Sequence, residues 1–230
     1  MKKRNRQQRR QVLKIVGAGG LVGLASMQAA QATTEITFEG VVEDNVEIST
    51  LPDFGSNVTA SDLNWNVSLG PTGVFGTPDI ALTWGLGFQT YVAWDGRGNV
   101  AQLDFNAATD IDLTFTPTPE FGVLLNSFFL DEWAGGEDMN VSWSIFDSQG
   151  TLASGTWLKS EPGGRDEILT GLTADDVTLG EAVTLRFNLV SGLPSYLALD
   201  NLTFQQVPEP SAIALGLLGL GALALRRRRD

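Results

Sequence analysis

The chain has 230 residues and a formal net charge of −12, and it contains neither cysteine nor histidine. These absences exclude disulfides, thiol nucleophiles, Ser-His-Asp catalysis and the common zinc sites. Residues 33–207 carry 25 acidic and 4 basic side chains, so this region repels phosphate backbones and binding to nucleic acid is excluded.

The first 32 residues have the three regions of an export signal. Met1–Lys14 is strongly basic, Ile15–Ala25 is apolar and rich in glycine, and the small residues Ala30 and Ala32 flank Gln31 at a cleavage sequence. We therefore predict a signal peptide over 1–32. Within it, Arg9 and Arg10 begin the stretch RRQVLK, which resembles a twin-arginine motif. Paired arginines also occur in ordinary basic signals, so the sequence leaves the choice of export translocon open.

Residues 33–206 show short runs of alternating apolar residues that are interrupted by Gly, Pro, Asn and Asp, with no long helical period. This pattern predicts an all-β domain, an antiparallel β-sandwich of the jelly-roll type with about ten to twelve strands. One short helix is expected near Arg165–Ala174, with Thr173–Asp176 as an alternative turn. The predicted strands and hairpins are Ile36–Gly40, Phe88–Phe105 with a turn at Asp95–Asn99, Ile111–Pro117, Val141–Trp157 with a turn at Asp147–Gly150, Ala182–Leu189 and Tyr196–Phe204.

The six tryptophans of the chain divide into two groups by their neighbours. Trp143 and Trp157 lie in alternating runs, which indicates a place in the core or in cross-strand pairs. Trp94, beside a predicted turn, and Trp133 are the candidates for a surface that stacks on sugar, with a packing role as the alternative. Trp133 lies in Asp131–Asn140, where four carboxylates lack the spacing of an EF-hand and a solvated loop is expected.

The segment after residue 206 has three parts in order. Val207 leads into Pro208-Glu209-Pro210, then Ser211–Leu225 follows without a charge, and the four arginines Arg226, Arg227, Arg228 and Arg229 come next. As a helix, residues 211–225 span roughly 22 Å, which the arginines can extend towards a membrane core of about 30 Å by snorkelling. We predict a transmembrane helix with the arginines on the cytoplasmic side and the body of the protein outside.

These three parts resemble the PEP-CTERM sorting signal of exported proteins from Gram-negative bacteria that make exopolysaccharide. The resemblance covers Val207–Asp230 and implies that a membrane protease-transpeptidase, exosortase, cleaves at or near Pro208-Glu209-Pro210. It further implies an inner-membrane anchor that is transient, followed by release to the cell surface or the extracellular matrix. The expected organisation is a signal peptide at 1–32, an ectodomain at 33–206 and the sorting signal at 207–230.

A second resemblance lies in the ectodomain. Ile36–Gly40 and Tyr196–Phe204 look like the first and last strands of many PEP-CTERM ectodomains and are similar to those of jelly-roll carbohydrate-binding modules. In such modules an acidic residue near each of these strands often shares a structural Ca²⁺, which implies Glu39 and Asp200, with Asn201 beside them, as ligands. The alternative is that Asp200 and Asn201 cap a strand end and that Glu39 is solvated.

Three functions follow from these features. The favoured interpretation is a non-enzymatic surface or matrix protein that associates with exopolysaccharide or biofilm. The first alternative is a calcium-assisted carbohydrate-binding module, and the second is a polysaccharide hydrolase or lyase. The sequence offers no nucleophile elbow, and its many carboxylates do not single out a catalytic pair. We therefore expect no enzymatic activity and no catalytic residues.

Overall fold

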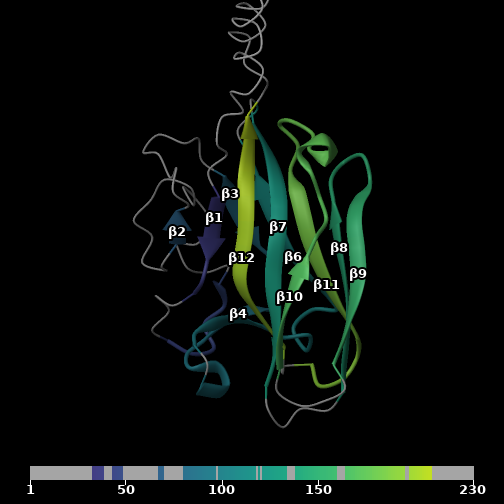
Figure 1. The fold of residues 1–230 in the computed structure, drawn as a ribbon. Coiled ribbons are helices and arrows are strands. Elements are labelled where there is room, and N and C mark those ends of the chain that lie inside the picture. The colour runs from purple at the N-terminus through teal and green to yellow at the C-terminus, as the bar shows by residue number, and fades with distance from the viewer. Residues whose placement is uncertain are drawn as a thin grey trace, which may run out of the picture. The chain divides into compact units, whose positions relative to one another are not determined.

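Two antiparallel β-sheets make up the part of the chain that the structure describes (Figure 1). The computed structural model describes residues 33–38, 43–48, 67–69, 80–96, 98–117, 119, 121–133, 138–159, 164–194 and 197–208. All of them belong to one compact unit, Ala32–Asp230, which is distinct from the unit Met1–Gln31. The prediction of an all-β antiparallel sandwich is confirmed.

The described strands cross between the two sheets several times along the chain. The strands are β1 (Thr33–Ile36), β2 (Val67–Leu69), β3 (Ala81–Trp84), β4 (Phe88–Tyr91), β5 (Val100–Leu103), β6 (Asp110–Thr116), β7 (Phe121–Glu132), β8 (Met139–Phe146), β9 (Thr151–Lys159), β10 (Gly164–Leu169), β11 (Val183–Ser191) and β12 (Leu197–Pro208). Two 3-10 helices, η3 (Trp94–Gly96) and η4 (Ala174–Asp176), lie between strands. Sheet A has the order β10-β7-β12-β1-β2, with β5 beside β12 and β4 beside β5. Sheet B has the order β3-β6-β11-β8-β9.

Strand β12 organises sheet A because it is paired on both edges. It runs antiparallel to β7 from the pair Leu197–Glu132 to the pair Pro208–Phe121. Its other edge is shared by β5, which pairs with the first residues of β12, and by β1, which pairs with Leu202–Gln205. The first and last described strands are therefore neighbours, but β1 ends at Ile36, the residue at which the predicted strand Ile36–Gly40 begins.

Alternation of apolar and polar residues determines which face of sheet B is buried. In β11, Val183, Leu185 and Phe187 are buried, while Arg186 points to the opposite face. There the Arg186 guanidinium donates to both carboxylate oxygens of Asp112 on β6, with Nε–Oδ1 at 2.7 Å and Nη2–Oδ2 at 2.6 Å. The strand predicted over Ala182–Leu189 is confirmed, and its alternation matches one buried face.

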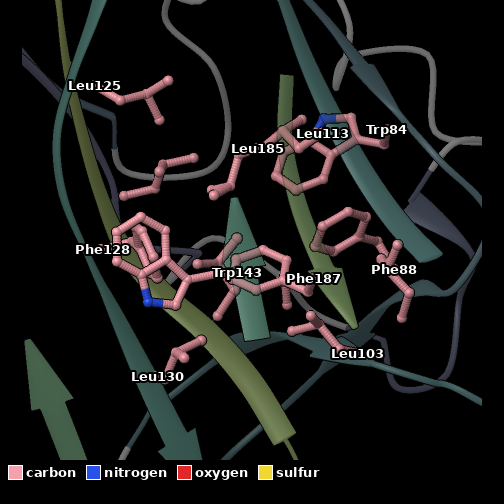
Figure 2. Close-up of a cluster of buried hydrophobic side chains, with 14 of the residues drawn as sticks. Trp84, Phe88, Leu103, Leu113, Leu125, Phe128, Leu130, Trp143, Leu185 and Phe187 are labelled. Carbon is pink, nitrogen blue, oxygen red and sulfur yellow. The ribbon is translucent and has the colours of Figure 1, made fainter. Parts of the chain in front are cut away.

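Aromatic side chains from both sheets meet in the core (Figure 2). Phe88 and Phe128 of sheet A lie on either side of Phe187, with ring centroids 6.5 and 5.5 Å away. Trp84 extends this series beyond Phe88, at 5.0 Å, and Trp143 extends it beyond Phe128, at 5.6 Å. All of these contacts are edge-to-face, the arrangement that the ring quadrupoles favour.

The predicted core positions of Trp143 and Trp157 are confirmed, since both are buried. The Trp143 indole lies over Gly155, where a Cβ atom would come within 2.6 Å of the ring. Trp157 donates its indole N–H to Asp166 on β10 (2.9 Å), and Lys159 Nζ contacts the same oxygen at 3.1 Å. These two hydrogen bonds lower the pKa of Asp166 and connect an edge of sheet B to an edge of sheet A.

Both predicted hairpins are confirmed. Strands β8 and β9 are joined by a turn in which Asp147 accepts hydrogen bonds from the backbone N–H groups of Gln149 and Gly150. Gly150 has φ of +146°, a conformation that side chains disfavour. Strands β4 and β5 are joined through η3, where Trp94 N donates to Gly98 O at 2.6 Å.

The helix predicted near Arg165–Ala174 is wrong. Residues Gly164–Leu169 form β10, the edge strand that pairs with β7, and only residues 174–176 are helical. Charged residues make this segment resemble an exposed helix, but they also suit an edge strand because they discourage further pairing. Backbone pairing with the long strand β7 therefore prevails over local helix propensity.

Candidate functional site

Asp200 lies at a bulge inside β12, not at a strand end. The register between β12 and β7 shifts between Asp200 and Thr203, and Asn201 takes φ of +41°, which asparagine tolerates better than most residues. The bulge lets the backbone N–H of Asn201 donate to Asp200 Oδ1 at 2.7 Å. Arg165 Nη2 donates to the other carboxylate oxygen at 3.0 Å.

This ion pair is largely shielded from solvent. The Asp200 side chain is 5% exposed and that of Arg165 is 29% exposed. The guanidinium carbon of Arg165 lies 4.4 Å from the centroid of the Phe129 ring, so the two groups form a cation–π contact. Sequence reasoning missed Arg165, although it is one of only four basic residues between positions 33 and 207.

The calcium site stays a prediction. Glu39 lies outside the described residues, and Asp200 and Asn201 have the contacts given above. Among the residues that the structure describes, no group of three or more Asp and Glu side chains is arranged to hold a metal ion.

Three aromatic residues form a second cluster, separate from the main core. Tyr91, Trp94 and Trp133 pack edge-to-face in a triangle, with centroid distances of 5.1 Å (91–94), 5.4 Å (91–133) and 5.1 Å (94–133). Trp94 is 1% exposed and covers Val100 and Ala198. Of the two roles that the sequence leaves open for Trp94, the structure shows the packing role, because its indole lies against Val100 and Ala198 of sheet A.

The aromatic cluster and the ion pair share the outer face of sheet A. Leu197 and Leu199 point into the main core, so the alternating residues Ala198 and Asp200 point to the opposite side. Trp94 packs on Ala198, and Arg165 reaches Asp200 two residues further along β12. Half-buried aromatic rings beside a guanidinium and a carboxylate are the groups that hold sugar rings and hydroxyls in binding sites.

The loop expected over Asp131–Asn140 begins later than predicted, because Asp131 and Glu132 belong to β7 and are buried. Glu132 is opposite Leu197, whose side chain is in the core. Burial raises the pKa of Glu132, Lys159 opposes this effect, and Asp138 and Asp131 add to it. The shifted pKa of this carboxyl thus results mainly from its interior position.

The residues next to the predicted signal-peptide cleavage site and next to the Pro-Glu-Pro sequence lie at the same end of sheet A. Thr33, the first residue of the predicted mature chain, pairs with Gln205, whose side-chain amide donates to Thr33 Oγ1 at 3.1 Å. Beyond Gln205, β12 continues through Val207 and Pro208, so the strand runs two residues past the expected domain boundary.

The other residues of the predicted export and sorting signals lie outside the described part of the chain. These are Arg9, Arg10, Ala30, Ala32, Glu209, Pro210, Arg226, Arg227, Arg228 and Arg229, together with the apolar run 211–225. Within the ranges that the structure describes, no helix has the length and apolar character needed to cross a membrane.

Solved structures give coarse likenesses only. A Stig cyclase from Fischerella sp. TAU has a TM-score of 0.34 and 15% identity, covering 58% of this chain and 77% of its own. A family 11 carbohydrate-binding module from Clostridium thermocellum, solved with a mixed-linked tetrasaccharide, has a TM-score of 0.33 and 11% identity, covering 79% and 99%. The enzymatically active domain of bacteriophage CBA120 tailspike protein 4 has a TM-score of 0.30 and 13% identity, covering 56% and 19%. These values are too low to transfer a site to this chain.

No curated protein matches the sequence. One family model does match, the PEP-CTERM protein-sorting motif, over residues 206–229. The match begins inside β12 and continues through the Pro-Glu-Pro sequence, the apolar run and the arginines. This chain therefore carries the PEP-CTERM sorting motif, the membrane-anchoring signal of exported proteins that exosortase processes.

Proposed function

We propose that this chain is a non-enzymatic protein of the cell surface or extracellular matrix of a Gram-negative bacterium, held in or near exopolysaccharide. The observation that carries the proposal is a sorting motif joined directly to a folded β-sandwich. Such a signal determines where the domain is delivered. The sequence of the domain itself offers no recognised catalytic motif. In this proposal the apolar run anchors the precursor in the inner membrane until exosortase removes the tail.

Deletion of residues 209–230 tests the proposal. We expect the shortened protein to be exported and folded but to appear in the culture medium, because nothing retains it at the membrane for sorting. The deletion starts after Pro208 so that every pair between β12 and β7 is preserved. The measurement is an immunoblot of medium, membrane and surface fractions.

Two controls accompany this measurement. The full-length chain with Leu158→Ala, an exposed position on β9 (66% exposed), should distribute like the wild type. Tryptophan fluorescence of the secreted deletion protein should show the buried indoles of the native fold. Unchanged retention of a folded deletion protein at the cell surface would contradict the sorting role.

A second candidate function, glycan binding, is favoured by the aromatic cluster on the same face of sheet A as the Arg165–Asp200 ion pair. The assistance by Ca²⁺ that the sequence predicts is part of this candidate. Tyr91 and Trp133 are half-buried, so part of each ring is exposed to solvent. Trp94 is buried, and both rings pack against it. This arrangement suits a sugar ring that stacks on the aromatic residues and forms hydrogen bonds to the charged pair.

Co-sedimentation with the exopolysaccharide of the producing organism tests this candidate. We expect saturable binding by the deletion protein and a loss of affinity of about tenfold in Trp133→Ala, equivalent to about 1.4 kcal/mol of lost stacking. Leu158→Ala, in the other sheet, is the matched control. A chelator in parallel samples reports any contribution of Ca²⁺. The absence of saturable binding in all samples would remove this candidate and leave a sorted structural domain.

A further inference from the structure

Strand β9 forms one edge of sheet B, and it is long and almost free of charge (Figure 1). Its residues Ala153–Lys159 pair with β8 in one uninterrupted register. No charged residue lies between Thr151 and Leu158. An edge strand presents the backbone N–H and C=O groups of every second residue away from its partner, and these groups are able to pair with a further strand.

The other described edge strands have features that discourage such pairing. Strand β10, an edge of sheet A, contains Arg165, Asp166 and Glu167 among its six residues. Strand β3, at the opposite edge of sheet B, has only four residues, and β2 and β4 have three and four. Charge and short length are the usual protection of a sheet edge. Among the edges that the structure describes, β9 therefore stands out as the one suited to a partner strand.

Contacts on the core side hold β9 in position. The Trp143 indole lies over Gly155 in the middle of the strand, and Trp157 is 5% exposed. Asp166 accepts hydrogen bonds from the Trp157 indole at 2.9 Å and from Lys159 at 3.1 Å, so the one charged side chain of β9 is paired at its last residue. A strand held in this way is preorganised for pairing, because little conformational entropy remains to be lost.

We propose that β9 is a self-association edge, at which two copies of this chain pair their β9 strands antiparallel around a two-fold axis near Gly155. Charge selects a second copy as the partner. Residues 33–207 carry 25 acidic and 4 basic side chains, so two copies repel each other through most of their surfaces. A two-fold axis in β9 brings no like charges opposite each other over Thr151–Leu158 and places the two Lys159 side chains at opposite ends of the shared ladder.

The pairing is weak in dilute solution and becomes significant where copies are concentrated. The six residues Ala153–Leu158 bury far less than the roughly 800 Å² per partner of a standard stable interface. Delivery of many copies to one surface by the sorting motif raises their local concentration, and the paired fraction rises without any new contact. Pairing at β9 would thus link the sandwiches to one another after delivery.

Sedimentation equilibrium of the protein isolated from the surface or medium of producing cells is the first test. We expect a reversible equilibrium between monomer and dimer, strengthened by NaCl because salt screens the repulsion between acidic copies. Thr156→Glu, at an exposed position of β9, should weaken the dimer by about tenfold, because it introduces like charges at the shared edge.

Thr83→Glu is the matched control, since Thr83 is an exposed threonine at the opposite edge of the same sheet. It changes the net charge by the same amount and should leave the dimer as strong as that of the wild type. A wild type that stays monomeric at the highest attainable concentration would overturn the proposal, and so would equal dimer strengths in the two variants. Unfolding midpoints in urea verify that both variants keep the fold.

Thiol cross-linking on intact cells is the second test, and it does not depend on weakening the dimer. Because the chain has no cysteine, a single cysteine introduced by Ser154→Cys or Thr156→Cys is joined by a short bismaleimide only to a second copy nearby. We expect cross-linked dimers with both variants and far fewer with Thr83→Cys. Equal yields at the two edges of sheet B, or no cross-linked dimer at β9, would show that this edge does not join the copies.

Discussion

Phe187→Ala is expected to lower the free energy of unfolding by about 3–5 kcal/mol, the usual cost of truncating a fully buried phenylalanine. Phe187 is 0% exposed and lies on β11, the middle strand of sheet B. Its ring contacts Phe88 and Phe128 from the opposite sheet. Removing the ring leaves a cavity between the sheets. Because the chain has no cysteine, no disulfide offsets the resulting loss of stability.

Urea unfolding followed by tryptophan fluorescence is the measurement for this prediction, since Trp84 and Trp143 lie in the same aromatic series. Phe187→Leu, which fills more of the space, should cost clearly less than the alanine variant. Leu169→Ala, at an edge-strand position that is 72% exposed, should change stability by no more than about 0.5 kcal/mol. A loss below about 1 kcal/mol in Phe187→Ala would show that this aromatic series does not join the sheets.

Local sequence patterns are sufficient to predict β6, β8, β9 and β11 of sheet B and the two hairpins, whereas β3 is not among the predicted strands. Strand β11 alternates with period two because one of its faces is buried, and the turn at Asp147–Gly150 requires the residue types found there. Both signals lie within a few neighbouring residues. They can therefore be recognised without knowing which strands pair.

Features that depend on pairing between distant strands were not predictable in the same way. Strand β7 is buried along both faces in places, so it shows little alternation. The sequence of β10 predicts a helix, because nothing within it reveals its pairing with β7. Trp94 beside a turn suggests exposure, yet its position over Ala198 depends on the pairing of β5 with β12.

The candidate site shows the same limit. The resemblance to jelly-roll modules implies Asp200 as a site residue, but its partner Arg165 comes from β10, and the strand order β10-β7-β12 brings the two together. The sorting motif, in contrast, is a linear signal, and the family match over residues 206–229 confirms it. Its junction with the fold is again a matter of pairing, since Val207 and Pro208 are in β12 because Gly122 and Phe121 are opposite them.

Breaking the ion pair between Arg165 and Asp200 should give unequal losses that depend on which partner is changed. Arg165→Met removes the cation and keeps an apolar stem over Phe129, so the carboxylate of Asp200, 5% exposed, loses this countercharge. We expect a loss of about 3 kcal/mol in the free energy of unfolding, the lower end of the range for an interrupted buried pair. Asp200→Asn should cost only about 1–2 kcal/mol, because Arg165, 29% exposed, can be solvated by water.

The double variant Arg165→Met/Asp200→Asn completes the thermodynamic cycle. If the pair acts as the structure indicates, the double variant loses less than the sum of the two single losses, since neither charge then remains buried alone. Additive losses would mean that the two residues stabilise the sheet independently.

Adding a chelator to the wild type distinguishes this ion pair from a calcium site. An ion bound at Asp200 makes the unfolding midpoint of the wild type fall on chelation, whereas the midpoint of Asp200→Asn does not change. An ion pair alone leaves both midpoints where they were, because the guanidinium of Arg165 then supplies the positive charge that this carboxylate needs.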